Sequence, residues 1–556
     1  MKQWERKVGT GASLKILLAG LLLILMVSVI LLSCVPPISK DALVHHLAVP
    51  KLYLEHGGMY EIPHCIHSYF PMNVDLMYII PLYFGNDVIP KFVHFFFGLL
   101  TAWLLFDYVR RRMNTIYGLL GALFFLSIPI IVKLSITVYV DLGLTFFSTA
   151  SLLFLLKWLE NQSSQKYLIL SAVFCGLAMG TKYNGLIICL LLTFFVPLFS
   201  LRYTQERKAV LAKSISNGFL FMMVAFIVFS PWMLRNFLWT HNPVFPMYDR
   251  IFNPESTLIQ KSQYLFEFRR YMYHETWWHI ALIPLRIFFQ GQDGNPQFFD
   301  GVLNPFLLLL PLCAFFRRRT DSPVIRREKN ILFAFSLLFF AFAFFGRDLR
   351  IRYLSVIIPP LVILSMYGIE KLLNLSASIP CLILRRVGLI GVTILLSIAL
   401  GLNARYVASQ YAYVAPFEYL QGSIGRDEYI ARYRSEYPAL MYVNTHLPQD
   451  SRILFLFVGK RGYYCDRNYV FDMDLYRESL LGDIVRGSKS PETVQQGLKR
   501  LGITHLLFNY DIFKDWAQTV FSDNEQQLLR DFFNTYGEVL FDERGYGLVR
   551  VTDPFH

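Results

Sequence analysis

The chain of 556 residues is 54% hydrophobic and 16% aromatic, carries charge on only 17% of its residues and has a mean hydropathy of +0.41. Soluble domains are rarely so apolar, so the surplus of apolar side chains must face lipid. The formal net charge of +13 comes mostly from short loops between apolar runs, which is typical of cytoplasmic loops. Composition and charge therefore exclude a soluble globular protein and give nucleic-acid binding no support.

Eleven apolar runs follow one another along the chain, each near the length that crosses a bilayer. They cover residues 14–33, 88–107, 116–134, 141–158, 168–181, 184–200, 214–233, 298–316, 331–346, 353–370 and 386–402. The first run could also describe a signal peptide, but Cys34-Val35-Pro36-Pro37 offers no small-residue cleavage site. We predict a polytopic α-helical membrane protein with about eleven transmembrane helices and a cytoplasmic amino terminus.

Lysine and arginine gather in alternate loops, as expected for loops on the cytoplasmic side. These residues are Arg110, Arg111, Arg112, Arg202, Arg207, Lys208, Lys213, Arg317, Arg318, Arg319, Arg326, Arg327, Lys329, Lys371, Arg385 and Arg386. This register places the first loop (34–87), the segment 234–297, the turn 346–352 and everything after residue 402 outside. The predicted location is the inner (plasma) membrane, crossed many times.

Residues 403–556 are far more polar than the part before them and are long enough for a domain. Residues 453–458 and 505–508 have the apolar pattern of buried strands. Ser490 followed by Pro491 reads as the start of a helix that would end near Leu501. We predict a transmembrane domain over 1–402 and a small extracytoplasmic α/β domain over 403–556. The seven cysteines show no metal-binding spacing.

Asp41 is the first acid after the first apolar run and lies in a loop rich in polar and aromatic residues. A carboxylate beside a bilayer is a candidate catalytic base. His45 would share a helical face with Asp41, whereas His46 would point elsewhere, so the two histidines would not easily bind one metal ion with Asp41. Hydrogen bonding at the membrane interface is the favoured role of both histidines, and metal ligation is the alternative.

A second group of charges breaks the positive-inside trend and so needs a local reason. The turn 346–352 carries Arg347, Arg350 and Arg352, with Asp348 between them and Tyr353 after them. Guanidinium groups match phosphate oxygens with paired donors, so a lipid-linked phosphate is a natural ligand. Lys182 and Arg235, also at predicted outer ends, could add to that site. The alternative is that these cations only contact lipid headgroups.

Asp141 stands at the predicted outer start of an apolar run. An ionisable group in such a position is costly to bury and is a functional candidate by default. Asp141 could equally cap its helix by accepting hydrogen bonds from the first free amides. Both roles can hold together.

Several of these segments, taken in order, resemble the GT-C membrane glycosyltransferases that use polyprenyl-phosphate sugars. The similarity is strongest to the branch with the Rhizobium lipopolysaccharide-core, aminoarabinose and protein O-mannosyl transferases. It rests on the Asp41 loop, Val140-Asp141-Leu142, residues 180–186 from Gly180 to Leu186, residues 230–236 from Ser230 to Asn236, Arg352-Tyr353-Leu354 and Pro359-Pro360-Leu361. Each motif alone is weak, and their order along the chain is the specific feature.

The resemblance implies an inverting transfer in which Asp41 deprotonates an acceptor hydroxyl that displaces a lipid phosphate at the anomeric carbon. Some members carry a second acid directly after this one, but Ala42 follows Asp41 here. The single acid leaves it undecided whether the site binds a divalent metal ion. Asp141 would hold the acceptor, orient Lys182 or help to bind such an ion. The expected site comprises catalytic Asp41 and Asp141, donor phosphate-binding Lys182, Arg235, Arg347, Arg350, Arg352 and Tyr353, and substrate-binding His45, His46, Tyr69 and Asp348.

The expected partners are a polyprenyl-phosphate sugar, an acceptor that is a lipid, a glycan or a protein, and membrane lipids. A transporter or flippase for a lipid-linked sugar would also be polytopic and basic, but should carry charges near mid-membrane. Here the apolar runs have almost no charge at their centres. A non-catalytic membrane scaffold is the third alternative, and it predicts that Asp41 and the arginines are dispensable.

Overall fold

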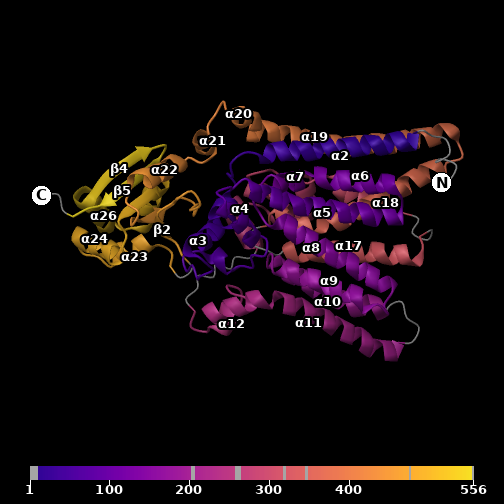
Figure 1. Cartoon of the computed structure of the whole chain (residues 1–556), viewed down its shortest axis with the longest axis horizontal. Coiled ribbons are helices and arrows are strands. Elements are labelled where there is room, and N and C mark those ends of the chain that lie inside the picture. The colour runs from indigo at the N-terminus through magenta and orange to yellow at the C-terminus, as the bar shows by residue number, and fades with distance from the viewer. Residues whose placement is uncertain are drawn as a thin grey trace.

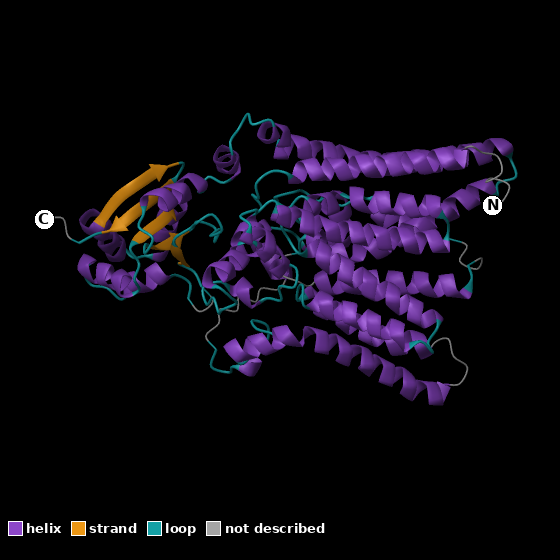
Figure 2. Cartoon of the chain, viewed as in Figure 1, coloured by secondary structure: helices purple, strands orange, loops and turns teal. Residues whose placement is uncertain are grey.

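The structure is a computed structural model that describes residues 10–201, 207–256, 265–316, 321–344, 349–474 and 477–553. Long helices run side by side in a bundle, and a smaller domain with a β-sheet lies beyond one end of it (Figure 1). The first described helix begins at the bundle end far from the sheet, and short helices fill the space between bundle and sheet (Figure 2). Arg347 and Asp348 lie outside the described residues.

In the described part of the chain the bundle is built from helices of very different length. They are α2 (Thr10–Ser33), α5 (Ile89–Arg112), α6 (Thr115–Ser127), α7 (Pro129–Ser135), α8 (Asp141–Glu160), α9 (Gln165–Met179), α10 (Asn184–Leu201), α11 (Arg207–Thr240), α17 (Pro323–Phe344), α18 (Ile358–Ala377) and α19 (Leu382–Val414), with the short α16 (Phe306–Cys313) packed on α18. Many of their outward side chains are large and apolar, as lipid contact requires. The prediction of a polytopic helical membrane protein is confirmed.

Fewer helices than the predicted eleven are both long enough and apolar enough to cross a membrane. Within the described ranges six helices are long and apolar enough to cross a membrane, and α6 with α7 would make a seventh, bent by 68°. The bend falls where Pro129 opens α7, because proline supplies no amide hydrogen to the preceding turn. Helices α9 and α10 are apolar but shorter, α16 has eight residues, and α17 opens with charged side chains.

Short helices at the sheet end of the bundle come from two loops. The first loop forms η1 (Ala42–His46), α3 (Ala48–His56), η2 (Ile66–Tyr69), η3 (Asp75–Tyr78) and α4 (Ile79–Tyr83). The second forms α12 (Asp249–Phe252), α13 (Leu265–Tyr273), α14 (Trp277–Ala281), α15 (Ile283–Phe289) and η4 (Pro296–Phe298), and η6 (Ile351–Ile357) precedes α18. The loop elements that surround Asp41 are therefore ordered and partly buried.

The carboxyl-terminal domain holds a five-stranded sheet in the order β2-β1-β3-β5-β4. Its strands are β1 (Arg452–Leu456), β2 (Asn468–Phe471), β3 (His505–Asn509), β4 (Gly537–Glu543) and β5 (Tyr546–Val551). Strand β1 runs parallel to both β2 and β3, whereas β5 is antiparallel to β3 and β4. Its helices are α20 (Pro416–Leu420), α21 (Arg426–Tyr433), α22 (Tyr437–His446), α23 (Leu480–Arg486), α24 (Pro491–Arg500), α25 (Tyr510–Val520) and α26 (Asp523–Tyr536).

Alternation along the strands gives each face of this sheet its own core. Leu454 and Leu506 point to the face covered by α23, α24 and α26, and Ile453 and Leu507 point to the face covered by α22. The two predicted strands and the predicted helix are confirmed, and Ser490 caps α24 as expected. A small α/β domain is therefore present.

Candidate active site

Asp41 meets Arg352 at the sheet end of the bundle. Asp41 comes directly before η1, and Arg352 belongs to η6, so the fold joins residues that are 311 positions apart. The Arg352 Nη2 atom donates to Asp41 Oδ2 over 2.5 Å. The same guanidinium lies over the rings of Tyr139 and Tyr353, at 4.8 and 5.2 Å from the ring centroids. Arg352 is thereby held by one ion pair and by contacts with two tyrosine rings.

This arrangement keeps Asp41 ionised. Burial alone would raise the pKa of the Asp41 carboxyl, but the charge and the hydrogen bond of Arg352 outweigh burial and hold its pKa below the ordinary value. His46 and Arg350 lower the pKa further. At neutral pH Asp41 is therefore a carboxylate that can accept a proton from a ligand.

A second ion pair joins Asp141 to Lys182. Asp141 is the first residue of α8, and Lys182 lies in the turn between α9 and α10, where its Nζ atom is 2.7 Å from Asp141 Oδ1. The Lys182 ammonium also lies 5.0 Å from the centroid of the Tyr353 ring, which links the two ion pairs. Asp141 Oδ2 is buried and accepts no hydrogen bond from any described residue. Asp141 does not cap α8 through its side chain.

The turn that carries Lys182 is held by contacts to the first loop. Asn73 donates its backbone amide to the Gly180 carbonyl over 2.9 Å, and its side chain accepts from Trp232 Nε1 over 2.8 Å. A Cβ atom on Gly180 would lie 2.3 Å from Asn73 Nδ2, so a larger residue would push the first loop away. Gly180 thus permits the close approach that places Lys182 beside Asp141.

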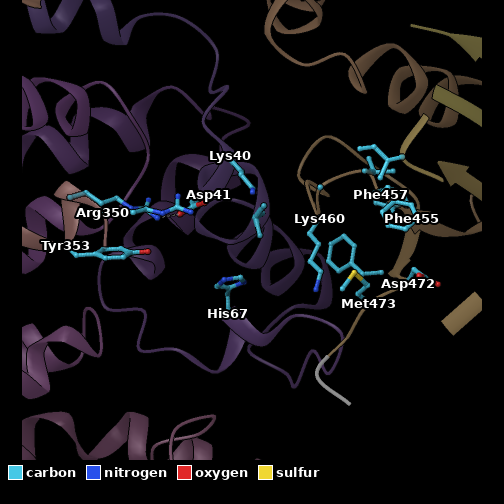
Figure 3. A pocket seen from close by; sticks show the side chains of 16 residues that line it. Lys40, Asp41, His67, Arg350, Tyr353, Phe455, Phe457, Lys460, Asp472 and Met473 are labelled. Carbon is cyan, nitrogen blue, oxygen red and sulfur yellow. Dashed lines mark hydrogen bonds and ion pairs between the residues drawn. The ribbon is translucent and has the colours of Figure 1, made fainter. Parts of the chain in front are cut away.

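Two neighbouring cavities open onto these ion pairs. The larger cavity, of about 520 Å³, lies between the bundle and the sheet domain and is lined by Lys40, Asp41, Val44, His67, Arg350, Arg352, Tyr353, Phe455, Phe457, Val458, Gly459, Lys460, Phe471, Asp472, Met473 and Ile512. The smaller, of about 120 Å³, is lined by Asp41, His45, His46, His67, Phe70, Pro71, Met72, Asp75, Val140, Thr181, Lys182, Arg352 and Tyr353. Figure 3 shows Asp41, Arg350 and Tyr353 on one side of the larger cavity and Phe455, Phe457, Asp472 and Met473 on the other.

The histidines near Asp41 form a stacked group. His45 lies between His46 and His67, with ring centroids 3.9 and 4.2 Å apart, and His46 Nδ1 is 2.6 Å from Asp75 Oδ1. Burial lowers the pKa of His45 well below its ordinary value and that of His67 to about 4, so both rings are neutral at pH 7. Among the described residues no three His, Cys, Asp or Glu side chains are grouped to hold a metal ion.

Arg350 lines the larger cavity and forms an ion pair with Asp300. Its Nη1 atom lies 3.2 Å from Asp300 Oδ2, and Asp300 also pairs with Lys133 of α7 at 3.0 Å. Lys133 reaches Asp293 as well, at 2.9 Å. Burial would raise the pKa of Asp300, but Lys133 and Arg350 hold it below its ordinary value. The segment after α15 therefore fixes one cation of the cavity wall.

The structure separates the predicted site residues into three groups. Those that line the two cavities are Asp41, His45, His46, Lys182, Arg350, Arg352 and Tyr353. Asp141 lies behind Lys182 and lines neither cavity. Arg235 and Tyr69 also line neither, because Arg235 binds Asn236 and the Phe70 carbonyl while Tyr69 donates to Glu61. Arg347 and Asp348 lie outside the described residues.

Sequence reasoning missed Tyr139, His67, Asp300 and Lys460. Lys460 follows a predicted strand with Gly459 before it, and residues just after a strand of a parallel sheet are frequent ligand contacts. That signal could have been used. Asp300 and Tyr139 depend on contacts between distant segments, which carry no local pattern.

Comparison with known proteins fits this arrangement. Residues 84–234 match the family described as dolichyl-phosphate-mannose-protein mannosyltransferase, a segment that includes Asp141 and Lys182. The crystal structure of ArnT from Cupriavidus metallidurans in the apo state superposes with a TM-score of 0.58 at 14% identity, covering 98% of each chain. The chain has the GT-C glycosyltransferase fold. No curated protein sequence matches it.

Two further structures share this GT-C fold. ArnT from Cupriavidus metallidurans bound to undecaprenyl phosphate gives a TM-score of 0.55 at 13% identity, over 96% of this chain and 97% of that one. The archaeal oligosaccharyltransferase AglB from Archaeoglobus fulgidus, in complex with an inhibitory peptide and a dolichol-phosphate, gives 0.55 at 10% identity, over 95% of this chain and 74% of that one. The similarity to ArnT extends over the sheet domain as well as the bundle, since it covers nearly the whole chain.

Proposed function

We propose that this protein is an inverting glycosyltransferase that moves a sugar from a polyprenyl-phosphate donor to an acceptor hydroxyl at the outer face of the membrane. The observation that carries the proposal is the Asp41 carboxylate, kept ionised by Arg352 and open to a cavity at the end of the bundle. The fold and the partial family match agree with this activity, and relatives of the same fold are bound to undecaprenyl phosphate or dolichol-phosphate.

In the proposed reaction Asp41 takes the proton of the acceptor hydroxyl as its oxygen forms a bond to the anomeric carbon. The bond from that carbon to the phosphate oxygen breaks, and the polyprenyl phosphate leaves with the electron pair. One displacement inverts the anomeric carbon. A positioned base is typically worth about 10²–10⁴-fold in rate. Arg350 and Arg352 line the same cavity and would stabilise the charge that develops on the leaving phosphate.

The low pKa of Asp41 fits this reaction if Arg352 serves both groups. A carboxylate held by a guanidinium is a weak base, although it is always ready in its ionised form. A phosphate that gains charge as it leaves would compete for Arg352 and loosen its hold on Asp41. The basicity of Asp41 would then rise as the acceptor proton needs to be removed.

The outer-face assignment rests on the charge of the loops. Arg110, Arg111 and Arg112 end α5, which begins beside the first loop, so this basic cluster lies at the opposite end of the bundle from Asp41. We accordingly propose an extracytoplasmic sheet domain and a location in the plasma membrane. The sugar and the acceptor stay unassigned. No observation favours a transporter or a scaffold.

The test compares cells that lack the protein with cells that regain either the wild type or Asp41→Asn. Mass spectrometry of lipids and glycans should show a defined sugar that disappears without the protein and returns with the wild type alone. An asparagine can still accept the hydrogen bond from Arg352, so the variant should fold, and its amount is measured in the same membranes. Full restoration by Asp41→Asn would refute the assigned base.

A further inference from the structure

The sheet domain supplies one wall of the larger cavity. Strand β1 ends at Leu456 and its parallel neighbour β2 ends at Phe471, and the residues that follow each strand line the cavity. Ligands of α/β sheets bind beyond the carboxyl ends of parallel strands, where loops converge. The turn from Phe457 to Lys460, called here the β1 turn, occupies that position.

The β1 turn is strained and firmly anchored. Phe457, Gly459 and Lys460 have φ values of 61°, 73° and 58°. Residues other than glycine rarely adopt such values, so the strain falls on Phe457 and Lys460. The Phe457 ring packs on Trp516 of α25 at 5.4 Å. A Cβ atom on Gly459 would lie 2.4 Å from Arg461 Nη1, and Arg461 is in turn paired with Glu436. Such strain persists only where surrounding contacts impose it and is common at ligand sites.

Hydrogen bonds join the chain after this turn to the loop that carries Asp41. The Tyr463 amide donates to the Leu43 carbonyl over 3.2 Å, and Tyr464 Oη donates to the Pro37 carbonyl over 2.8 Å. Lys51 of α3 donates to the Tyr463 carbonyl over 3.0 Å. The β1 turn and the catalytic loop are therefore held as one unit, with the cavity between them.

Two lysines of the cavity have no ion-pair partner among the residues that the structure describes. Arg350 and Arg352 are paired with Asp300 and Asp41, whereas Lys40 and Lys460 form no ion pair with any described residue. In Figure 3 the Lys460 side chain lies between His67 and Met473, on the sheet-domain side of the cavity. Burial lowers the pKa of Lys460, although Asp472 and Asp474 act in the opposite direction. A partly buried ammonium without an ion pair is suited to bind an anion.

We propose that the β1 turn is the acceptor side of the cavity and that Lys460 binds an anionic group, a phosphate or a carboxylate, carried by the acceptor. This inference rests on the proposed transferase function. Lys460 belongs to the sheet domain and faces the wall formed by Arg350 and Tyr353, which continues into the bundle where a lipid-linked donor would sit. The donor phosphate is the other source of such an anion, and the experiment separates the two.

The first experiment measures how fast an amine-reactive reagent modifies Lys460 in the purified full chain, read out by mass spectrometry. The probes are glucose 6-phosphate, methyl glucuronide, neutral glucose and undecaprenyl phosphate. Lys514, exposed on α25, is the internal reference. The two anionic sugars should slow modification of Lys460 about tenfold at about ten times their Kd, and glucose should not. Protection by undecaprenyl phosphate alone, or by no anion, would overturn the proposal.

The second experiment repeats the complementation with Lys460→Gln, Lys460→Arg and Lys514→Gln. Losing one charge-assisted contact should lower the sugar-modified product about tenfold in Lys460→Gln. Lys460→Arg should restore most of it, and Lys514→Gln should match the wild type. Equal product in Lys460→Gln and wild type would contradict the role.

The two proposals can fail separately. Protection of Lys460 by anionic sugars needs no turnover, so it would stand even if no sugar were transferred. Loss of product in Asp41→Asn without any protection of Lys460 would leave the transferase intact and remove the anion site.

Discussion

The two ion pairs of the site differ in which member is exposed to solvent. In the first, the Asp41 carboxylate is 20% exposed and its partner Arg352 is 9% exposed. In the second, the Asp141 carboxylate is 1% exposed and its partner Lys182 is 22% exposed. The acid is therefore the more exposed member of the first pair, in which both members line the cavities, whereas in the second pair only Lys182 lines a cavity.

This difference assigns different work to the two acids. Asp41 can touch a ligand and take its proton, whereas Asp141 can act only through the ammonium that it holds. An exposed Lys182 with a buried counter-ion is a fixed positive charge aimed at the smaller cavity. The expectation that Asp141 is a catalytic group gives way to a proposal that it positions Lys182.

Exchange of each acid for its amide should separate these roles most clearly. In the purified protein Asp41→Asn should lower kcat by about 10²–10⁴-fold, because the general base is lost. Asp141→Asn should lower it by only about tenfold, because Lys182 keeps its charge and loses one ionic partner. Initial rates with a synthetic polyprenyl-phosphate sugar would measure both. Equal losses in the two variants would show that exposure does not distinguish them.

A similar comparison can be made between Arg350, which lines the larger cavity, and its counter-ion Asp300. Arg350→Ala should raise the donor KM about tenfold with a smaller effect on kcat, because a phosphate contact is lost. Asp300→Asn should raise the donor KM less, since Arg350 keeps its charge but loses its support. Arg405→Ala, an exposed arginine of α19, is the matched control. An unchanged donor KM in Arg350→Ala would remove Arg350 from the phosphate site.

Sequence alone predicted the class of fold and, of the cavity walls, Asp41, His45, His46, Lys182, Arg350, Arg352 and Tyr353. Hydropathy and loop charge found the membrane helices because lipid contact imposes long apolar runs. Asp41, Arg350 and Arg352 stood out because each is a charge beside an apolar run. What an apolar run does not reveal is the bend before Pro129 within one predicted run, or that the run 298–316 forms only the short α16.

The pairing of these residues could not be predicted in the same way. Asp41 and Arg352 are separated by 311 positions along the chain, and no local sequence pattern indicates that they are in contact. Arg235 carries the same charge signal as Arg350 yet is turned toward Asn236. The β1 turn was missed because its role depends on where the sheet domain docks.

The smallest expected effect concerns pH and the histidines beside Asp41. Burial lowers the pKa of His67 from its ordinary value of 6.5 to about 4, so the unfolded chain takes up a proton at a higher pH than the folded one. The stability that this neutral ring contributes is complete above pH 6.5, declines as the pH falls toward 4, and is then lost. Asp41, with its lowered pKa, adds a loss only as the pH approaches its ordinary value of 3.8, and most of its contribution is lost below that value.

The apparent melting temperature in detergent should therefore fall from pH 6.5 to pH 4, and fall less steeply in His67→Phe. Phenylalanine keeps a ring that can stack on His45 but cannot be protonated. The two proteins should give parallel curves above pH 7, which serves as the control for any general loss of packing. His45 also has a lowered pKa, so part of the slope should persist in the variant. Identical slopes below pH 6.5 would mean that the folded state admits a proton at His67, and that this ring is not held neutral beside the Asp41 carboxylate.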